Sequence, residues 1–275
     1  MAAITAKDVN ELRKKTGAGM MDCKKALTEA NGDMEAAIDL LRKKGQKVAA
    51  KRGDREASEG LVIAKTSEDG SKGYLISINC ETDFVAKNED FGKFANNIIA
   101  IAMNNNLSTK DDLLSAAYEG SVSVGDKITE QTGVIGEKIE IAGFETVESA
   151  SVVAYNHPGN QIATIVGLTA KEDEAGRQVA MQVAAMAPIS VDETSVPQDV
   201  INKELEIGKE LAIQEGKPAE MAEKIAQGRL KKFYKETTLL NQQFIRDNKQ
   251  TVAQFLKSNN PDLTVTDFKR ISLSN

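Results

Sequence analysis

Side chains that could perform covalent chemistry are few in this chain of 275 residues: two cysteines, Cys23 and Cys80, and a single histidine, His157. A cysteine beside a histidine could act as a nucleophile activated by a general base. The sequence, however, predicts Cys23 in the middle of a helix and Cys80 at the end of a buried strand, where free cysteines are usually inert. A Cys/His hydrolase is therefore a minor alternative, which predicts that thiol reagents inhibit some turnover.

Metal and nucleotide chemistry have no better support in the sequence. One histidine and two separated cysteines cannot make a zinc site, and the acidic residues do not follow the spacing of a calcium loop. The chain has no G-x-x-x-x-G-K-[ST] phosphate loop, and Gly17-Ala18-Gly19 lacks the third glycine of a dinucleotide-binding fingerprint. We therefore expect no enzyme, no catalytic residues, no cofactor, no metal and no direct binding of a nucleotide.

Three other features are candidate binding surfaces. Met20 and Met21 are adjacent at the start of a predicted helix, so both cannot point fully inward, and we expect one of them to stay exposed. Phe84 follows Asp83 in a predicted loop, where it either folds back on the core or serves as a contact. His157 stands just before a Pro-Gly turn, which favours a solvated turn residue over a binding contact.

Composition limits the class of partner. The net charge is −6, aromatic residues make up 4% and Trp is absent, so neither a basic groove nor a stacking platform for nucleic acid is expected. Residues 1–55 hold 13 Lys and Arg against 8 Asp and Glu, which makes a small basic head on an acidic body. Two cysteines, no signal peptide and no apolar stretch of about 20 residues predict a cytoplasmic protein without a membrane segment.

The sequence predicts that these residues are positioned by a series of helices and strands. Residues 1–55 predict three short amphipathic helices, the third ending at Gly45, followed by a linker over 47–58. A hairpin of two strands over 61–78, a helix over 89–104 and further strands and helices follow, which predicts an α+β fold. Gly216-Lys217-Pro218 separates two predicted helices, each with one narrow apolar stripe and polar residues elsewhere. This pattern favours a projecting antiparallel helical hairpin.

Part of this pattern occurs twice. A strand over 73–80 precedes one helix, and a strand over 161–168 precedes another, but the first connection is four residues longer. The additional residues lie in the stretch that contains Thr82-Asp83-Phe84-Val85. A loop that a second copy of the module does without is a place where function tends to be found.

Three segments resemble motifs of the translation elongation factor Ts family, and the likeness covers the whole chain in order. The first is LRKKTGAGMMDCKKAL over 12–27, the second is CETDFVA over 80–86, and the third runs from GKP at 216–218 to KKF at 231–233. The resemblance implies a ubiquitin-associated-like three-helix domain and linker over 1–55, a core subdomain N over 56–143, and a core subdomain C over 144–275. The helical hairpin would be an insertion at about 197–237, before a C-terminal module.

The resemblance also implies a partner, the GTPase elongation factor Tu, and a function, the exchange of its GDP for GTP. By this likeness Phe84 wedges into the GTPase domain, Asp83 helps to disturb its Mg²⁺, and Thr82 and Val85 complete that segment. The other implied partner contacts are Met20, Met21, Lys24, Ile135, Gly136, His157 and Ile245.

A different class of function remains open on the sequence. The basic head could belong to an adaptor that docks another protein, in which case Asp83 and Phe84 are incidental. Deletion of residues 1–55 distinguishes the two hypotheses, because it should remove all binding by an adaptor and leave an exchange factor with partner affinity in its core.

Overall fold

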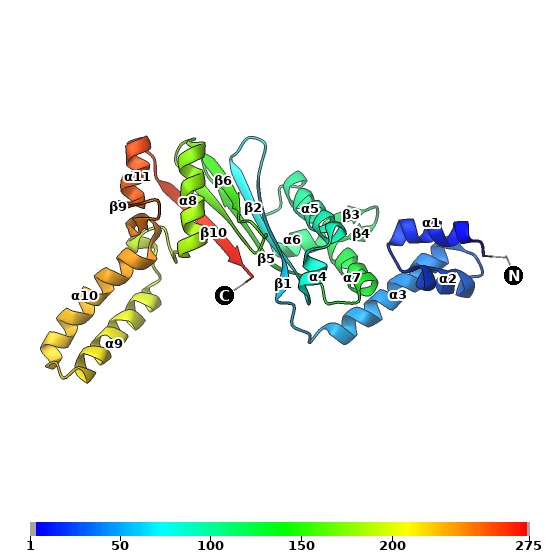
Figure 1. The fold of residues 1–275 in the computed structure, drawn as a ribbon, viewed down its shortest axis with the longest axis horizontal. Helices are drawn as coiled ribbons and strands as arrows, with labels where there is room; N and C mark the ends of the chain where they lie inside the picture. The colour runs from blue at the N-terminus through cyan, green and yellow to red at the C-terminus, as the bar shows by residue number, and fades with distance from the viewer. Residues whose placement is uncertain (1–3, 274–275) are drawn as a thin grey trace. The chain divides into compact units, whose positions relative to one another are not determined.

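The computed structural model describes residues 4–273, which divide into two compact units (Figure 1). The first unit holds residues up to 63 together with 76–145, and the second holds 64–75 together with 146–272. Helices combine with sheets in both units, so the predicted α+β class is confirmed. The finer division at residues 55 and 143 stays a prediction.

The first unit begins with three helices and continues with a mixture of helices and strands. Its helices are α1 Ala6–Thr16, α2 Met20–Glu29, α3 Met34–Arg52, α4 Asp83–Ala86, α5 Glu89–Asn104, α6 Lys110–Ser115 and α7 Val124–Ile135. The strands β1 Glu59–Thr66, β2 Lys72–Cys80 and β5 Glu140–Glu148 form a sheet in the order β1-β2-β5, and β3 Ala117–Glu119 pairs with β4 Val122–Ser123. Residues 64–66, 72–75 and 146–148 of these strands are counted with the second unit. Strand β2 is buried along its whole length.

The three N-terminal helices form a small core of their own. Thr5 and Asp8 cap α1 reciprocally, as the sequence predicts, and α1 ends at Gly17 with φ of 71°, a left-handed conformation that favours glycine. Leu12 and Leu27 are fully buried in this core, where Cys23 packs with them. The helices thus carry their polar residues outward around an apolar centre.

Helix α3 does not end at Gly45, and that prediction is wrong. The helix continues to Arg52, so part of the expected linker is helical. Gly45 is buried where α3 crosses α7, and a Cβ atom added to Gly133 on α7 would collide with the Gly45 backbone. The glycine therefore allows two helix backbones to approach closely instead of terminating the helix.

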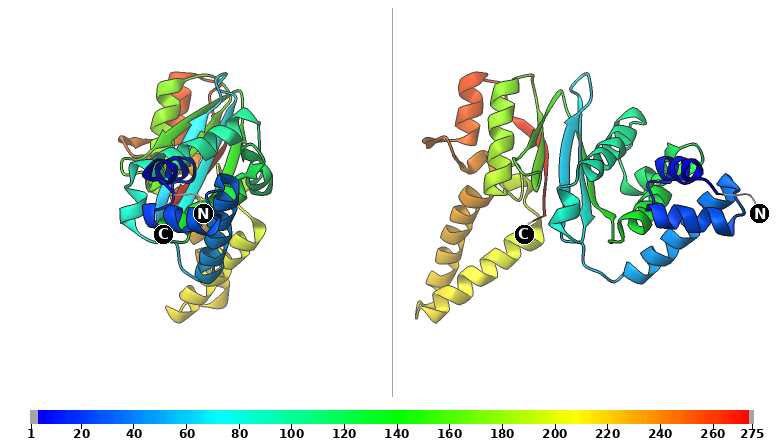
Figure 2. Two further views of the ribbon diagram at one scale, coloured as in Figure 1. Left: turned by 90° about the vertical axis from the view of Figure 1, so that its right-hand side faces the viewer. Right: turned by 45° about the vertical axis from the view of Figure 1, so that its right-hand side comes forward.

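The second unit contains a sheet with a helix on one face. Its elements are β6 Ser151–Asn156, β7 Ile162–Leu168, α8 Asp173–Met186, η1 Glu193–Ser195, α9 Gln198–Gln214, α10 Ala219–Thr237, η2 Leu239–Asn241, β8 Gln243–Phe244, β9 Asp247–Thr251, α11 Val252–Asn259 and β10 Val265–Ser272. Strand β7 lies between β10 and β6 and pairs antiparallel with both. Helix α8, light green in Figure 2, packs against this sheet.

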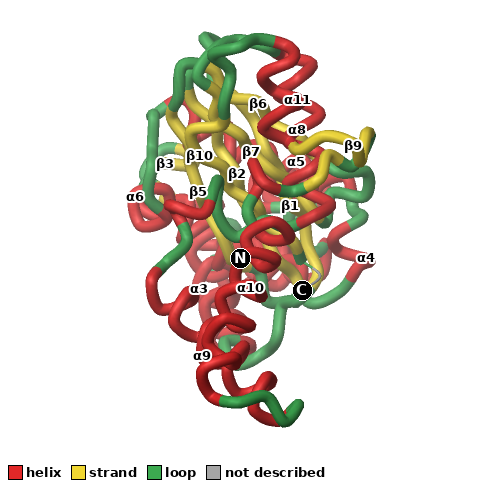
Figure 3. Tube along the Cα trace, turned by 90° about the vertical axis from the view of Figure 1, so that its left-hand side faces the viewer, coloured by secondary structure: helices red, strands yellow, loops and turns green. Residues whose placement is uncertain are grey.

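Helices α9 and α10 form the predicted hairpin and lie side by side (Figure 3). Gly216 turns the chain with φ of 78°, and Pro218 stands directly before α10. The seam between the helices is made of small residues: a Cβ on Gly208 would lie 3.0 Å from the Ala226 Cα. Close packing along one narrow seam leaves the rest of both helices to solvent.

The predicted repeat is present as two strand-then-helix modules. Eight residues separate β2 from α5, whereas four separate β7 from α8. The four additional residues match the length of α4. This short helix is thus an addition that the second module lacks.

Candidate functional site

Phe84 stands on α4, directly after the buried strand β2. Thr82 caps this helix, its side chain accepting a hydrogen bond from the Val85 amide. The Phe84 side chain is 84% exposed, so it does not fold back on the core. The predicted irregular loop is instead one helical turn, because Thr82 supplies an N-cap.

Two carboxylates hold the residues just before this turn. Glu137 accepts hydrogen bonds from the Glu81 amide at 3.2 Å, the Thr82 amide at 3.0 Å and the Thr82 hydroxyl at 2.7 Å. Glu81 in turn accepts from the Lys138 amide at 2.6 Å and from Arg52, at the end of α3, at 2.8 and 2.9 Å. These bonds to the Lys138 amide and to Arg52 lower the pKa of Glu81.

Asp83 is paired on the same turn. Its carboxylate accepts from the Lys87 ammonium at 2.6 Å, one helical turn along the chain. This hydrogen bond and the lysine's charge lower the pKa of Asp83, so the side chain is an anion at neutral pH. Asp83 therefore presents a negative charge beside the exposed ring of Phe84.

Residues from three sequence regions line one hollow next to this turn. It measures about 430 Å³, and its walls include Gly17 from the first motif, Val85 from the second, and Ile135 at the end of α7. Gly136 ends α7 in the left-handed conformation, with φ of 81°. The structure thus brings Val85 and Ile135 together, with Gly136 next in the chain.

The head of the first unit exposes two methionines. Met20 is 53% and Met21 is 74% exposed, so the expected exposure of one methionine is confirmed and the second is exposed as well. Cys23, Ala26 and Leu27 supply the buried face of α2 instead, and Lys24 is exposed beside them. Two adjacent methionines outside the core form an adaptable apolar patch.

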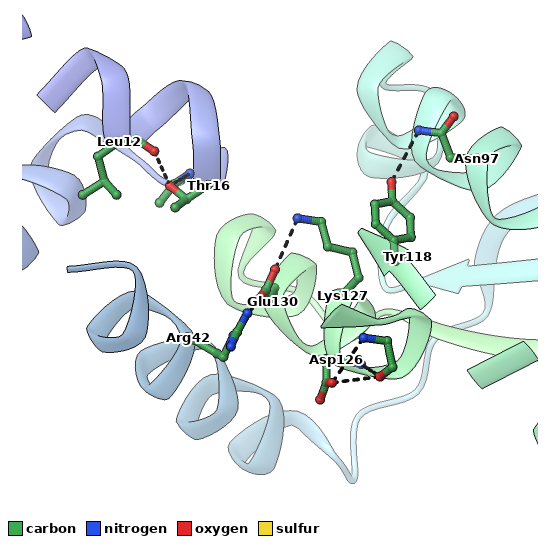
Figure 4. A network of polar contacts seen from close by, with 10 residues as sticks. Leu12, Thr16, Arg42, Asn97, Tyr118, Asp126, Lys127 and Glu130 are labelled. Atoms are coloured by element: carbon green, nitrogen blue, oxygen red, sulfur yellow. Dashed lines mark hydrogen bonds and ion pairs between the residues drawn. The ribbon is translucent and has the colours of Figure 1, made fainter. Parts of the chain in front are cut away.

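The head is joined to the rest of its unit through α3 and α7. Glu130 on α7 accepts from Arg42 on α3 at 2.9 Å and from Lys127 at 3.2 Å (Figure 4). This polar network accompanies the Gly45–Gly133 crossing of the same two helices. Helix α3 therefore packs against the methionine-bearing helix α2 and ends at Arg52, the partner of Glu81.

The two remaining predicted contacts lie in the second unit. His157 is exposed after β6, and its Nδ1 atom lies 2.9 Å from the Tyr155 hydroxyl. Ile245 is 43% exposed between β8 and β9, and its amide donates to the buried Gln182 at 2.9 Å. Each is held by a hydrogen bond of its own within that unit.

Both cysteines are unsuited to nucleophilic chemistry. Burial, with a contribution from the Glu137 charge, raises the pKa of Cys80 to about 12, and its thiol donates to the Thr82 carbonyl at 3.2 Å. Burial also raises the pKa of Cys23. At neutral pH both groups are thiols rather than reactive thiolates, which weighs against the hydrolase alternative.

Within residues 4–273, no group of three or more His, Cys, Asp or Glu side chains is arranged to hold a metal ion. Over the same range, no helix is both long enough and apolar enough to cross a bilayer.

Sequence reasoning missed the residues that hold the Phe84 turn. No sequence pattern gives Glu81, Arg52 or Glu137 a role. Their bonds join positions 29 to 57 residues apart, beyond the reach of any local pattern. The only signal is indirect, an acidic residue beside each of two candidate contact segments.

Comparisons with known proteins agree on one family. The family profile described as Elongation factor TS matches residues 81–275. Elongation factor Ts of Christiangramia forsetii is 56% identical over 276 residues, which cover 99% of this chain and 100% of that protein. The proteins of the same name from Flavobacterium psychrophilum and Amoebophilus asiaticus are 52% and 49% identical, over 99% and 98% of this chain and 100% and 98% of their own lengths.

Proposed function

The chain belongs to the elongation factor Ts family, and we propose that it binds elongation factor Tu carrying GDP and promotes exchange of the GDP for GTP. The observation that carries this proposal is Phe84, an aromatic side chain 84% exposed on a turn held by hydrogen bonds. A large apolar side chain fixed outside the core is suited to insertion into a partner.

The proposed mechanism is disturbance of the partner's nucleotide site. GTPases hold the phosphates of their nucleotide with a backbone cradle and with Mg²⁺, which tolerates little departure from octahedral geometry. Phe84 acts as a wedge in the GTPase domain, and the Asp83 carboxylate disturbs the surroundings of the metal. Thr82 and Val85 complete the inserted segment. Small shifts of the loops that support the Mg²⁺ then release it and loosen the phosphates.

Such an exchange factor needs preferential binding and no covalent step. By linkage, the factor weakens GDP binding by the same ratio that GDP weakens binding of the factor. A loss of about 4 kcal/mol in GDP affinity corresponds to release about a thousandfold faster when association is unchanged. GTP then binds the vacated site and displaces the factor.

The remaining contacts anchor the factor on its partner. Met20, Met21 and Lys24 present an apolar patch with a cation beside it, suited to one face of a helix. Ile135 and Gly136 contact the same GTPase domain next to the wedge. In the second unit, His157 acts near the phosphate side, and Ile245 contacts another domain of the partner.

The decisive experiment is release of fluorescent GDP from elongation factor Tu, with and without stoichiometric amounts of this chain. We expect faster release with no hydrolysis of nucleotide. An unchanged rate of GDP release at micromolar concentrations of this chain would contradict the proposal.

Removal of Mg²⁺ tests the proposed task of Asp83. Asp83→Ala should slow release in the presence of Mg²⁺, and the defect should shrink when a chelator has already removed the metal. Lys87→Ala, which removes the ion-pair partner and keeps the carboxylate, is the matched control. An Asp83→Ala defect of equal size with and without chelator contradicts the role at the metal.

A further inference from the structure

We propose that Glu81 and Glu137 are positioning residues for nucleotide exchange, forming a reciprocal clamp that holds the turn bearing Phe84. The inference rests on the proposed function of that turn. We define the clamp as Glu81 and Glu137 with the groups that they bind: Arg52, the Thr82 amide and hydroxyl, and the backbone amides of Glu81 and Lys138.

The hydrogen bonds of the clamp are reciprocal. Glu137 accepts from the backbone of the 81–82 segment, at 3.2 and 3.0 Å, while Glu81 accepts from the backbone just after Glu137, at 2.6 Å. Each segment therefore supplies both a carboxylate and an amide to the other. With the bond from the Thr82 hydroxyl, four hydrogen bonds join the two segments, and Arg52 donates two more to Glu81. All six have a charged acceptor. Charge-assisted bonds of this kind are stronger and shorter than neutral ones.

The turn itself has little that would fix its direction. Helix α4 has four residues, which is too few to be stable alone. Phe84 projects into solvent and adds almost no packing. The orientation of its ring therefore depends on what holds the residues before it, and the clamp binds the chain within three residues of the ring.

Glu137 also sets the direction of the helix cap. The Thr82 hydroxyl donates its proton to Glu137 at 2.7 Å, which leaves its lone pairs free to accept from the Val85 amide at 3.5 Å. Without Glu137 the hydroxyl can rotate and the cap is no longer enforced. One carboxylate thus fixes both the chain before α4 and the first turn of α4.

A Phe84 ring that is already held in place before binding favours exchange, because no conformational entropy has to be lost when the ring enters the partner. A flexible side chain must be immobilised when it enters a partner, which weakens the strained complex in which the nucleotide leaves. Contacts made elsewhere on the factor are unaffected by this turn. Loss of the clamp should therefore lower the maximal exchange rate more than the affinity for the partner.

Exchange kinetics with Glu137 variants test the inference. Glu137→Ala should lower the maximal rate of GDP release at saturating factor by about tenfold, with little change in the half-saturating concentration. Glu137→Gln, which keeps the shape and one acceptor, should lie between this variant and the unmodified chain. The matched control is Glu140→Ala, which removes an acid that pairs with the Lys138 side chain and has no bond to the turn. An unchanged maximal rate in both Glu137 variants overturns the clamp.

A second measurement reads the turn without the partner. The chain has no tryptophan, so Phe84→Trp introduces a unique fluorescent reporter. Its anisotropy decay should show wider local motion when Glu137→Ala or Glu137→Gln is added than when Glu140→Ala is added. Equal motion in all three overturns the clamp, and Glu137→Gln decides the question where Glu137→Ala fails to fold. If the unmodified chain does not release GDP, the proposed function fails, while this measurement still decides the clamp.

Discussion

Phe84 is exposed on a short helical turn, and hydrogen bonds hold the residues just before that turn. Single apolar side chains on a surface are common and need no explanation by themselves. Phe84 differs because the chain before it is bound by the carboxylates of Glu81 and Glu137. The second strand-helix module has no counterpart of this turn. At the scale of the residue, these features agree with the proposed role of Phe84 as a contact to a partner, and they show that folding does not need its ring.

Phe84→Ala should leave stability nearly unchanged and cut exchange. The free energy of unfolding should shift by less than about 0.5 kcal/mol, because the ring makes almost no contact that is lost. The maximal rate of GDP release should fall far more than affinity for nucleotide-free elongation factor Tu. Denaturant unfolding and stopped-flow release measure the two quantities. Met186→Ala is a control that shortens another exposed apolar side chain. Unfolding of the Phe84 variant would show that the ring belongs to the core.

Glu81 should make stability depend on pH in one direction. A carboxyl whose pKa is lower in the folded state contributes stability above its unfolded pKa and loses it as the pH falls through the folded pKa. The pKa of Glu81 is lowered from 4.5 by the Lys138 amide and by Arg52. The chain should therefore unfold at a higher temperature than Glu81→Gln at neutral pH, and the difference should shrink below pH 4.5. A difference that stays constant across that range contradicts the assignment, and Glu140→Gln controls for the loss of one negative charge nearby.

At the scale of elements, the crossing of α3 and α7 links the head to the rest of the first unit. Gly45 and Gly133 meet backbone to backbone, and Arg42 and Lys127 both bind Glu130 beside them. A glycine after two lysines is a typical helix ending, and so the sequence predicts that α3 ends at Gly45. The sequence alone does not distinguish a glycine that ends a helix from a glycine that allows two helices to pack closely. Only the partner helix, 88 positions away, distinguishes them.

Two glycine substitutions should change the free energy of unfolding in opposite directions. Gly133→Ala should destabilise the chain by about 1–3 kcal/mol, because the new methyl group collides with the Gly45 backbone. Gly228→Ala, on the exposed side of α10 with no atom within 4 Å of the new methyl, should stabilise it by about 0.5–1 kcal/mol through helix propensity. Thermal and denaturant unfolding of both variants measure the difference. A Gly133→Ala chain as stable as Gly228→Ala would mean that the helices separate without penalty.

Much of the fold could be predicted because its signals are local. The cap of Thr5 and Asp8, the Gly216 to Pro218 break and each of the two strand-helix modules lie within a short stretch of sequence. The position of the Phe84 segment followed from the same repeat. Its helical turn has only a short local signal, the capping of the Val85 amide by Thr82. Its clamp could not be predicted, since it depends on bonds between segments 29 to 57 residues apart. Exposure of both Met20 and Met21 was missed because Cys23 and Leu27, not a methionine, complete the buried face of α2.

At the scale of the whole molecule, the proposed contacts are distributed over both compact units. The head and the Phe84 turn belong to the first unit, while His157 and Ile245 belong to the second. A contact surface divided in this way can separate the control of affinity from the control of the release rate. Under the proposed function, we expect the anchors to set how tightly the factor binds and Phe84 to set how fast the nucleotide leaves. An adaptor that docks through its head alone would make no such separation, so the two hypotheses differ in what each surface controls.

Met20 and Met21 allow that difference to be measured. Changing both to Ala should weaken binding to nucleotide-free elongation factor Tu by about 1–3 kcal/mol, the range for losing exposed apolar anchors. The melting temperature should hardly move, because both side chains lie outside the core of the head. The rate of GDP release at saturating factor should be retained, since the wedge is intact. Combined with Phe84→Ala, the defects should fall on different quantities, affinity from the head and maximal rate from the turn. Under the adaptor hypothesis the methionine change abolishes binding and Phe84→Ala has no effect. Titration of the release rate against factor concentration for the four chains separates these outcomes, and a large loss of melting temperature would instead place the methionines in the core.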